Sequence, residues 1–310
     1  MTPANSAVAQ TQRPLARGYH ALIGLGDFGV LVVGGSTARP LTGKSLADAW
    51  VFKNGQWTAA SKGIPPVSAD AAGYDARLGR AIVLSEEYSN REVVSPSGTF
   101  IYDPRTDRWD QKAATGRPSV SAARAAYDSK AQRLIVVTER GETWAYDLEA
   151  DRWTNRLPRV SPPGRRYPAM AYDAGSDRTI LFGGYINGDD TWAYDYAANT
   201  WTEMRPAKSP SSRLYHAMVY DPKTDRMILF GGASNGSETP FADTWTYDFD
   251  SNTWQEVMAE RAPTPRGWHA MAYDATSGTI VLFGGGADRD HFQADTWIFD
   301  PVRRTWTSVP

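Results

Sequence analysis

Arginine, aromatic and histidine side chains recur together at one spacing in this 310-residue chain. Four short segments carry the pattern: RGYH (17–20), RRYP (165–168), RLYH (213–216) and RGWH (266–269). A guanidinium group beside an aromatic ring suits the recognition of a carboxylate, a phosphate or another anionic group. The candidate ligand-binding residues are therefore Arg17, Tyr19, Arg165, Tyr167, Arg213, Tyr215, Arg266 and Trp268.

Groups capable of acid–base chemistry lie elsewhere, mostly in stretches that vary between the repeats described below. The candidate catalytic residues are Glu86, Glu87, Glu238, Asp288, Asp290 and His291. His291 and its neighbours Asp288, Asp290 and Asp295 have the composition of a local cation site, but a solvated charged loop is the more common explanation. The other three histidines, His20, His216 and His269, share one repeat position, and we expect them to be structural and hydrogen-bonded. We predict no metal site.

Composition excludes several classes of function. The chain has 33 basic and 35 acidic residues, a formal charge of −2, which argues against a nucleic-acid or anionic-membrane binder. It has no cysteine, which excludes disulfides, thiolate metal sites and cysteine nucleophiles. No run of 18 apolar residues is present. We expect no cofactor.

Tryptophans reveal the elements that must position these side chains. Trp57, Trp109, Trp153, Trp201, Trp254 and Trp306 are 44 to 53 residues apart. Each interval also contains a Tyr-Asp pair such as MAYD (170–173), and most contain an apolar run that ends in two glycines, such as ILFGG (180–184). Asp, Asn, Gly and Pro fill the connections, as turns require. A repeat of this length with four short strands indicates the blades of a propeller.

The chain is therefore predicted to be all-β, a six-bladed β-propeller of four-stranded antiparallel blades. Residues 1–16 match no repeat and are expected to form a flexible N-terminal arm. Residues 17–310 form a single propeller, with blades at about 17–60, 67–113, 119–156, 164–204, 212–257 and 265–309. We expect blades 6 and 1 to close the ring by packing, without a blade shared between the termini.

The order of motifs resembles the Kelch repeat: a glycine pair, then an Asp before an aromatic, as in DTWAYDYAANTW (190–201). The resemblance covers about 17–309 and implies a Kelch-type propeller. It is weaker in blades 2 and 3, where SEE (85–87) and TER (138–140) replace the glycine pair. The fold by itself leaves the activity open, because function depends on the site.

The loops that enter the first strand and join the second to the third should share one face of such a ring. The four Arg–aromatic segments then form a continuous arc over blades 4, 5, 6 and 1. We expect Arg165, Arg213 and Arg266 to point toward the channel mouth on this face. The structural alternative is that the arginines bind carbonyls of neighbouring blades. The aspartates before the tryptophans, such as Asp243, are expected to cap loops.

These observations favour a binding module, in which the arc recognises an anionic small molecule or a partner protein. The alternative is a non-redox enzyme, of isomerase/mutarotase or cyclase type, acting on a small metabolite at the channel mouth. A third hypothesis is a structural or assembly domain with partners on the blade sides. We expect a monomer that binds no nucleic acid and spans no membrane. Its compartment stays open, because Ala7-Val8-Ala9 is similar to the end of a signal peptide but no apolar segment precedes it.

Overall fold

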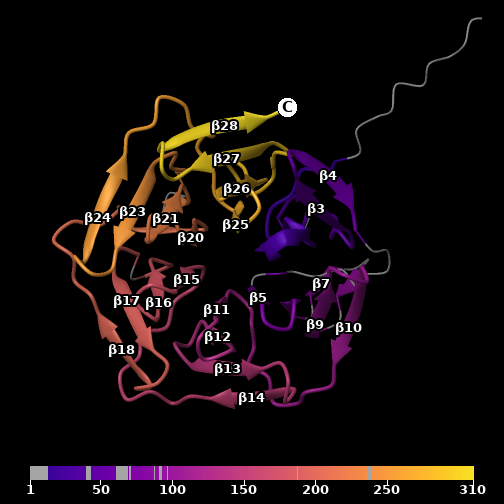
Figure 1. Cartoon of the computed structure of the whole chain (residues 1–310), viewed down its shortest axis with the longest axis vertical. Helices are drawn as coiled ribbons and strands as arrows, with labels where there is room; N and C mark the ends of the chain where they lie inside the picture. Colours follow the sequence, from indigo (N-terminus) through magenta and orange to yellow (C-terminus); the bar gives the residue numbers. More distant parts are fainter. Residues whose placement is uncertain are drawn as a thin grey trace, which may run out of the picture.

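Six β-sheets form a closed ring around a central channel in the computed structural model of the chain (Figure 1). The structure describes residues 13–39, 43–60, 69, 71–86, 88–90, 93–95, 97–186, 188–235 and 239–310. Each sheet has four antiparallel strands and lies within one of the predicted repeat units. The predicted six-bladed all-β propeller is therefore confirmed.

The first three blades follow one another in the chain. Blade 1 contains β1 (Ala21–Gly24), β2 (Val30–Val33), β3 (Ala49–Lys53) and β4 (Gln56–Ala59). Blade 2 contains β5 (Ala71–Asp75), β6 (Arg80–Ser85), β9 (Gly98–Asp103) and β10 (Arg108–Lys112). Blade 3 contains β11 (Arg124–Asp128), β12 (Arg133–Val137), β13 (Thr143–Asp147) and β14 (Arg152–Asn155).

The second half of the ring repeats the pattern. Blade 4 contains β15 (Ala169–Asp173), β16 (Arg178–Phe182), β17 (Thr191–Asp195) and β18 (Thr200–Glu203). Blade 5 contains β20 (Ala217–Asp221), β21 (Arg226–Phe230), β23 (Thr244–Asp248) and β24 (Thr253–Val257). Blade 6 contains β25 (Ala270–Asp274), β26 (Thr279–Phe283), β27 (Thr296–Asp300) and β28 (Thr305–Val309).

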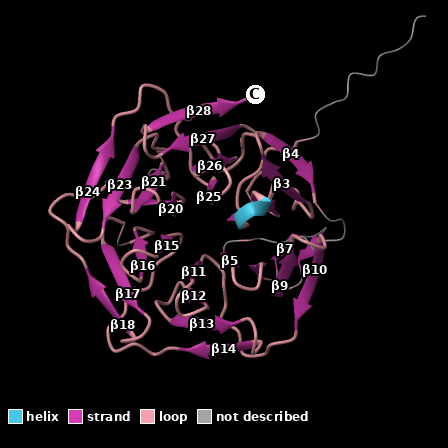
Figure 2. Ribbon diagram, viewed as in Figure 1, coloured by secondary structure: helices cyan, strands magenta, loops and turns pink. Residues whose placement is uncertain are grey.

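Short elements decorate the blades. The 3-10 helix η1 (Gly26–Phe28) joins the first two strands of blade 1 and is the helix drawn in Figure 2. The hairpin β7 (Tyr88–Asn90) and β8 (Val93–Ser95) is inserted between the second and third strands of blade 2, and β19 (Arg213–Leu214) pairs with β22 (Ala233–Ser234). No helix in the described ranges has the length and apolar character needed to cross a membrane.

Local side-chain bonds explain why the turns close where they do. In blade 5 the Asp221 carboxylate accepts hydrogen bonds from the backbone N–H groups of Lys223 and Thr224 at 3.2 and 3.0 Å. The turn then ends at Asp225, which has a φ of 55°, in the left-handed region that Asp can adopt. Tyr220 donates to Asp225 at 2.7 Å and fixes this geometry.

Interfaces between blades hold the core. The second strand of each blade is almost fully buried, as in Ile228 to Phe230. The fourth-strand tryptophan packs on the preceding blade, and in four interfaces its indole N–H donates to a threonine hydroxyl there. These pairs are Trp201–Thr143, Trp254–Thr191, Trp306–Thr244 and Trp57–Thr296, all at 2.9–3.0 Å.

The ring closes by packing between blades 1 and 6. Every strand of these two sheets comes from its own repeat, and the closure contains the Trp57–Thr296 bond and the contact of Trp57 with Phe283, whose ring centroids are 5.0 Å apart. The prediction of closure without a shared blade is confirmed for the described residues. Most of the predicted N-terminal arm, residues 1–12, lies outside them, so that assignment stays a prediction.

Candidate functional site

Two sets of loops meet on one face of the ring, which we call the loop face. The segment entering the first strand of a blade pairs with the loop between its second and third strands. Gly18 bridges Ser36 in blade 1, Arg166 bridges Tyr185 in blade 4, and Gly267 bridges Gly286 in blade 6. The predicted sharing of one face by these loops is therefore correct.

Arg213 shows the arrangement common to four arginines on this face. Its guanidinium donates to both carboxylate oxygens of Asp243 at 2.7 Å, and to the carbonyl oxygens of Gly231 and Ser211 at 2.9 Å. The indole of Trp245 donates to the same carboxylate at 2.7 Å. The equivalent sets are Arg17–Asp48–Trp50, Arg165–Asp190–Trp192 and Arg266–Asp295–Trp297.

These contacts correct the expected orientation of Arg17, Arg165, Arg213 and Arg266. Their guanidinium groups are fully buried and bonded to an aspartate of the same blade, so they do not point into the channel mouth. The aspartates anchor an arginine rather than cap a loop. Burial raises the pKa of Asp48, but hydrogen bonds from Arg17 and Trp50 outweigh it and hold that pKa below its usual range.

Glycine pairs connect three of these four arginines, Arg17, Arg213 and Arg266, to the preceding blade. The N–H of Gly285 donates to the carbonyl of Arg17 at 2.9 Å, and Gly284 adopts a φ of 70°. A Cβ on Gly284 would lie 2.5 Å from that carbonyl oxygen, so a side chain there would break the contact. The arginine, aspartate and glycine pair therefore form one structural unit across the blade interface.

The aromatic residues of the arc do form a continuous cluster. The ring centroids of Tyr167 and Tyr215 are 4.5 Å apart, those of Tyr215 and Trp268 are 4.6 Å apart, and Trp268 lies 6.4 Å from Tyr19. Phe292 joins the Tyr19 end at 5.9 Å. Tyr215 and Trp268 are buried in the middle of this aromatic arc, while its two ends at Tyr167 and Tyr19 are partly exposed.

Each of the four aromatic residues has a left-handed backbone. Their φ values lie between 56° and 59°, and Ala122 adopts 54° at the corresponding place in blade 3. The left-handed conformation costs roughly 1–2 kcal/mol for residues other than glycine. Glycine would avoid this cost, so the backbone conformation does not explain why these four positions carry large aromatic rings.

Three histidines follow the aromatic positions and pack into blade interfaces. His20, His216 and His269 lie edge-on against Phe283, Phe182 and Phe230, with ring centroids 5.4–5.7 Å apart. Burial, followed by the charge of the nearby arginine, lowers the pKa of His20 and His269 to about 3 and that of His216 well below its usual value.

These imidazoles are therefore neutral near pH 7. None of the six ring nitrogens makes a well-formed hydrogen bond within the part of the chain that the structure describes. The expected structural role fits this packing, but the expected hydrogen bonds are not formed among the described residues, where the rings pack on phenylalanines instead.

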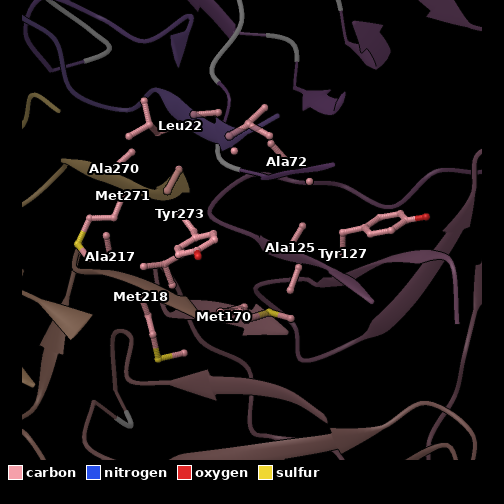
Figure 3. Close-up of a pocket in the computed structure, with 18 of the residues that line it drawn as sticks. Leu22, Ala72, Ala125, Tyr127, Met170, Ala217, Met218, Ala270, Met271 and Tyr273 are labelled. Carbon is pink, nitrogen blue, oxygen red and sulfur yellow. The ribbon is translucent and has the colours of Figure 1, made fainter. Parts of the chain in front are cut away.

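Below the arc lies a cavity of about 590 Å³, lined by the first strands of all six blades. Figure 3 shows its wall of small and apolar side chains, among them Ala72, Ala125 and Ala270, with Met170, Met218 and Met271 on three successive blades. Among the described lining residues, Arg124 carries the one permanent charge. Its guanidinium lies 5.8 Å from the ring centroid of Tyr167.

Comparison with protein-family models places residues 137–310 in the KLHDC2/KLHL20/DRC7 Kelch-repeats domain. This match covers more than half of the chain. The chain belongs to this Kelch-repeat family. Kelch domains commonly mediate protein interactions. A comparison with curated proteins gave no match.

The acid–base candidates of this Kelch propeller have separate partners. Asp288 contacts the ring of His291 at 3.0 Å, Asp290 pairs with Arg39 of blade 1, and Asp295 pairs with Arg266. No cluster of three or more metal-ligating side chains occurs among the described residues. The carboxylates of this loop, which the sequence identified more readily as a solvated charged loop than as a cation site, are thus engaged by His291, Arg39 and Arg266.

The remaining candidates are in the loops of blades 2 and 5. The Glu86 carboxylate accepts a hydrogen bond from the backbone N–H of Val120 and lies 3.7 Å from Arg117, so it joins blades 2 and 3. Glu87 and Glu238 lie outside the described residues. Their catalytic assignment stays a prediction.

Sequence reasoning missed several residues of the Kelch loop face. Arg124 extends the aromatic arc into blade 3, and Phe292 extends it at the blade 6 end. Tyr185 and Ile186 are exposed apolar side chains in the loop of blade 4. Their position directly after the glycine pair of blade 4 was a usable signal, because loops that vary on a regular scaffold often carry function.

Proposed function

We propose that this Kelch propeller is a protein-interaction module that binds a partner protein through its loop face. The aromatic arc formed by Tyr167, Tyr215, Trp268 and Tyr19 supports the contact surface at the mouth of the central cavity. Its partly exposed ends, Tyr167 and Tyr19, make the contacts, and the buried Tyr215 and Trp268 hold them in position. Arg124, beside Tyr167, sets the charge at the open end of the arc.

The observation that carries the proposal is the left-handed backbone of the aromatic residues. Four blades place a large ring at a position where φ is close to 57°, and the rings contact one another around the mouth. Strained residues concentrate at functional sites, and tyrosine and tryptophan are enriched at protein interfaces. Both trends support a binding role for the arc.

The bonding of the arginines favours a partner protein over a small anion. All four guanidinium groups of the repeat are engaged by aspartate and glycine in their own blade. A small anion would have to displace these buried ion pairs, whereas a protein can use the aromatic edges and the surrounding loops. No contact among the described residues specifically favours the enzymatic alternative.

Site-specific photo-crosslinking tests the proposal. A photoreactive amino acid replaces either Lys44, exposed on the loop face, or Val302, exposed in a turn on the opposite face. The full chain is then irradiated in an extract of its source. We expect discrete protein adducts from position 44 and none from position 302. The same adducts from both positions, or adducts from position 302 alone, would overturn the proposal.

A further inference from the structure

We infer that the connection between blades 3 and 4 docks an acidic peptide segment containing apolar side chains. This connection, residues 156–166, is called the strap. The inference rests on the proposed function and assigns the partner chemistry and the sector of the loop face that recognises it.

Exposed apolar side chains concentrate around the strap. Four of the seven large apolar residues found exposed in the described chain lie here: Leu157, Val160, Tyr185 and Ile186. Ile186 is 74% exposed and Leu157 is 76% exposed. Such a concentration marks an interaction site more often than scattered exposed residues do.

Contacts between segments tie the strap to the neighbouring loops of blades 3 and 4. The N–H of Tyr185 donates to the carbonyl of Arg166 at 2.8 Å, which joins the blade 4 loop to the end of the strap. A Cβ placed on Gly164 would lie 2.7 Å from the carbonyl oxygen of Glu139, so the strap also runs against the 138–142 loop. The C-terminal end of the strap, this loop and residues 185–186 are therefore in contact. From there the strap extends to the outer strand of blade 4, where the N–H of Trp201 donates to the carbonyl of Val160 at 3.4 Å.

The strap is fixed at both ends. Arg156 lies 4.1 Å from the ring centroid of Tyr196 and donates to the Tyr196 carbonyl at 3.0 Å. At the other end, Arg165 is held by Asp190. A surface held in place before binding loses less conformational entropy when a partner docks. The exposed side chains are thus presented by an ordered segment.

Two of the exposed apolar residues also have unfavourable backbones. Leu157 has a φ of 47° and Ile186 a φ of 87°, which is unusual for a β-branched residue. At the position equivalent to Leu157, blade 4 has Arg205 with a φ of 46°. The turn therefore accepts a polar residue, and its geometry does not require leucine.

Charge points to an acidic partner. The strap contains Arg156, Arg159, Arg165 and Arg166 and no acidic residue. Arg159 is exposed beside Val160, and Arg140 is exposed on the adjoining loop. Of the acidic neighbours, Glu139 pairs with Arg166 at 2.9 Å and Glu142 accepts the indole N–H of Trp144 at 3.2 Å, while Asp189 is exposed in the blade 4 loop after Ile186. Basic side chains next to exposed apolar groups complement a segment that carries Asp or Glu and Leu or Phe.

A random 12-residue peptide library displayed on phage, panned against the full chain, tests this inference. The affinity of the selected peptides is then measured by fluorescence polarisation for the unchanged chain and for two double variants, Leu157→Ser/Ile186→Ser and Arg140→Glu/Arg159→Glu. The matched control is Met258→Ser/Arg261→Glu, in the connection between blades 5 and 6, where Met258 occupies the position equivalent to Leu157. All six side chains are exposed, so folding should be preserved.

We expect the selected peptides to be acidic and to carry apolar residues. Both strap variants, Leu157→Ser/Ile186→Ser and Arg140→Glu/Arg159→Glu, called the sector variants, should bind them at least tenfold more weakly, and the control should change by less than twofold. Binding should also weaken at high salt. Selection of no peptide, or of peptides that ignore both sector variants, overturns the inference. Binding lost in Tyr167→Gly but kept in the sector variants also overturns it and leaves the proposed function standing. Sector-dependent binding to phosphatidylglycerol vesicles without peptide binding, or sector-dependent self-association, would assign a different occupant.

Discussion

Arg213 and Asp243 form a two-pronged ion pair in which the guanidinium has no solvent exposure and both N–O distances are 2.7 Å. The same pair occurs in blades 1, 4 and 6. It ties the entrance of the first strand to the start of the third strand. The four arginines, which in the sequence suggested anion binding, therefore form buried ion pairs that hold the segments of the loop face in place. We call these ion pairs the frame of the loop face.

Arg213→Ala is expected to lower the free energy of unfolding by about 3–5 kcal/mol, because it leaves Asp243 without its buried partner. Urea denaturation of the purified chain measures this change. Arg205→Ala serves as the control, since Arg205 is exposed and its one ion pair among the described residues is with Glu203. The urea midpoint of this variant should hardly move. A stable Arg213→Ala protein would show that the ion pair is not part of the frame.

Thr296→Val tests the closure of the ring. The change removes the acceptor for the Trp57 indole and leaves a partly buried N–H unpaired between blades 1 and 6. We expect a loss of about 1–2 kcal/mol in unfolding free energy, the usual cost of such a group. Thr307→Val, at an exposed position of β28, should change stability little. Equal effects of the two substitutions would argue against the proposed role of this bond.

Stability should fall between pH 6.5 and pH 5 because of the buried histidines. Burial lowers the pKa of His20 and His269 to about 3, so in this range the unfolded chain binds protons that the folded chain does not. Stability contributed by each neutral ring is thus complete above about pH 6.5 and is lost as pH falls, by about 1.4 kcal/mol per pH unit for each histidine.

His269→Asn should make this pH dependence shallower, measured as urea midpoints at pH 5, 6 and 7. Exposed His291 provides the control. Asp288 raises its pKa, so its contribution has the opposite sign: it is present below about pH 6.5 and is lost as pH rises. His291→Asn should therefore not reduce the loss of stability on acidification. An unchanged slope in His269→Asn would mean that its ring accepts a proton in the folded state.

Repetition made the fold predictable, because tryptophans, Tyr-Asp pairs and glycine pairs each mark a fixed strand. Six units of four strands and closure by packing followed directly. The roles of the arginines did not, because Arg213 and Asp243 are 30 residues apart in sequence and become partners only after the blade folds.

A signal for this pairing was nonetheless present in the sequence. Blades 2 and 3, which have Val67 and Val120 at the arginine position, also lack an aspartate before the third-strand aromatic; blade 3 has Glu142 there. Arginine and aspartate are thus present together or absent together. The exposed residues Leu157 and Ile186 lacked such a repeat signal, because each lies where the blades differ.

The surface role of the aromatic arc is tested by replacing Tyr167 with glycine. Tyr167 has a φ of 56°, so glycine relieves a conformational cost of roughly 1–2 kcal/mol. The lost ring contact with Tyr215 costs about 0.5–1.5 kcal/mol, so overall stability should change little. A loss of binding without a loss of stability would then isolate the contact surface from the frame.

The most direct test of partner binding by the aromatic arc compares two proteins that carry a photoreactive group at position 44, one with Tyr167 and one with Tyr167→Gly. The measurement is the yield of protein adducts from each. Arg304→Gly is the matched control, because Arg304 also has a left-handed φ, 57°, but lies in a turn on the opposite face. We predict that Tyr167→Gly lowers the adduct yield at least tenfold and that Arg304→Gly leaves the yield unchanged, with both proteins folded. Undiminished adducts in a folded Tyr167→Gly protein would contradict partner binding by the aromatic arc.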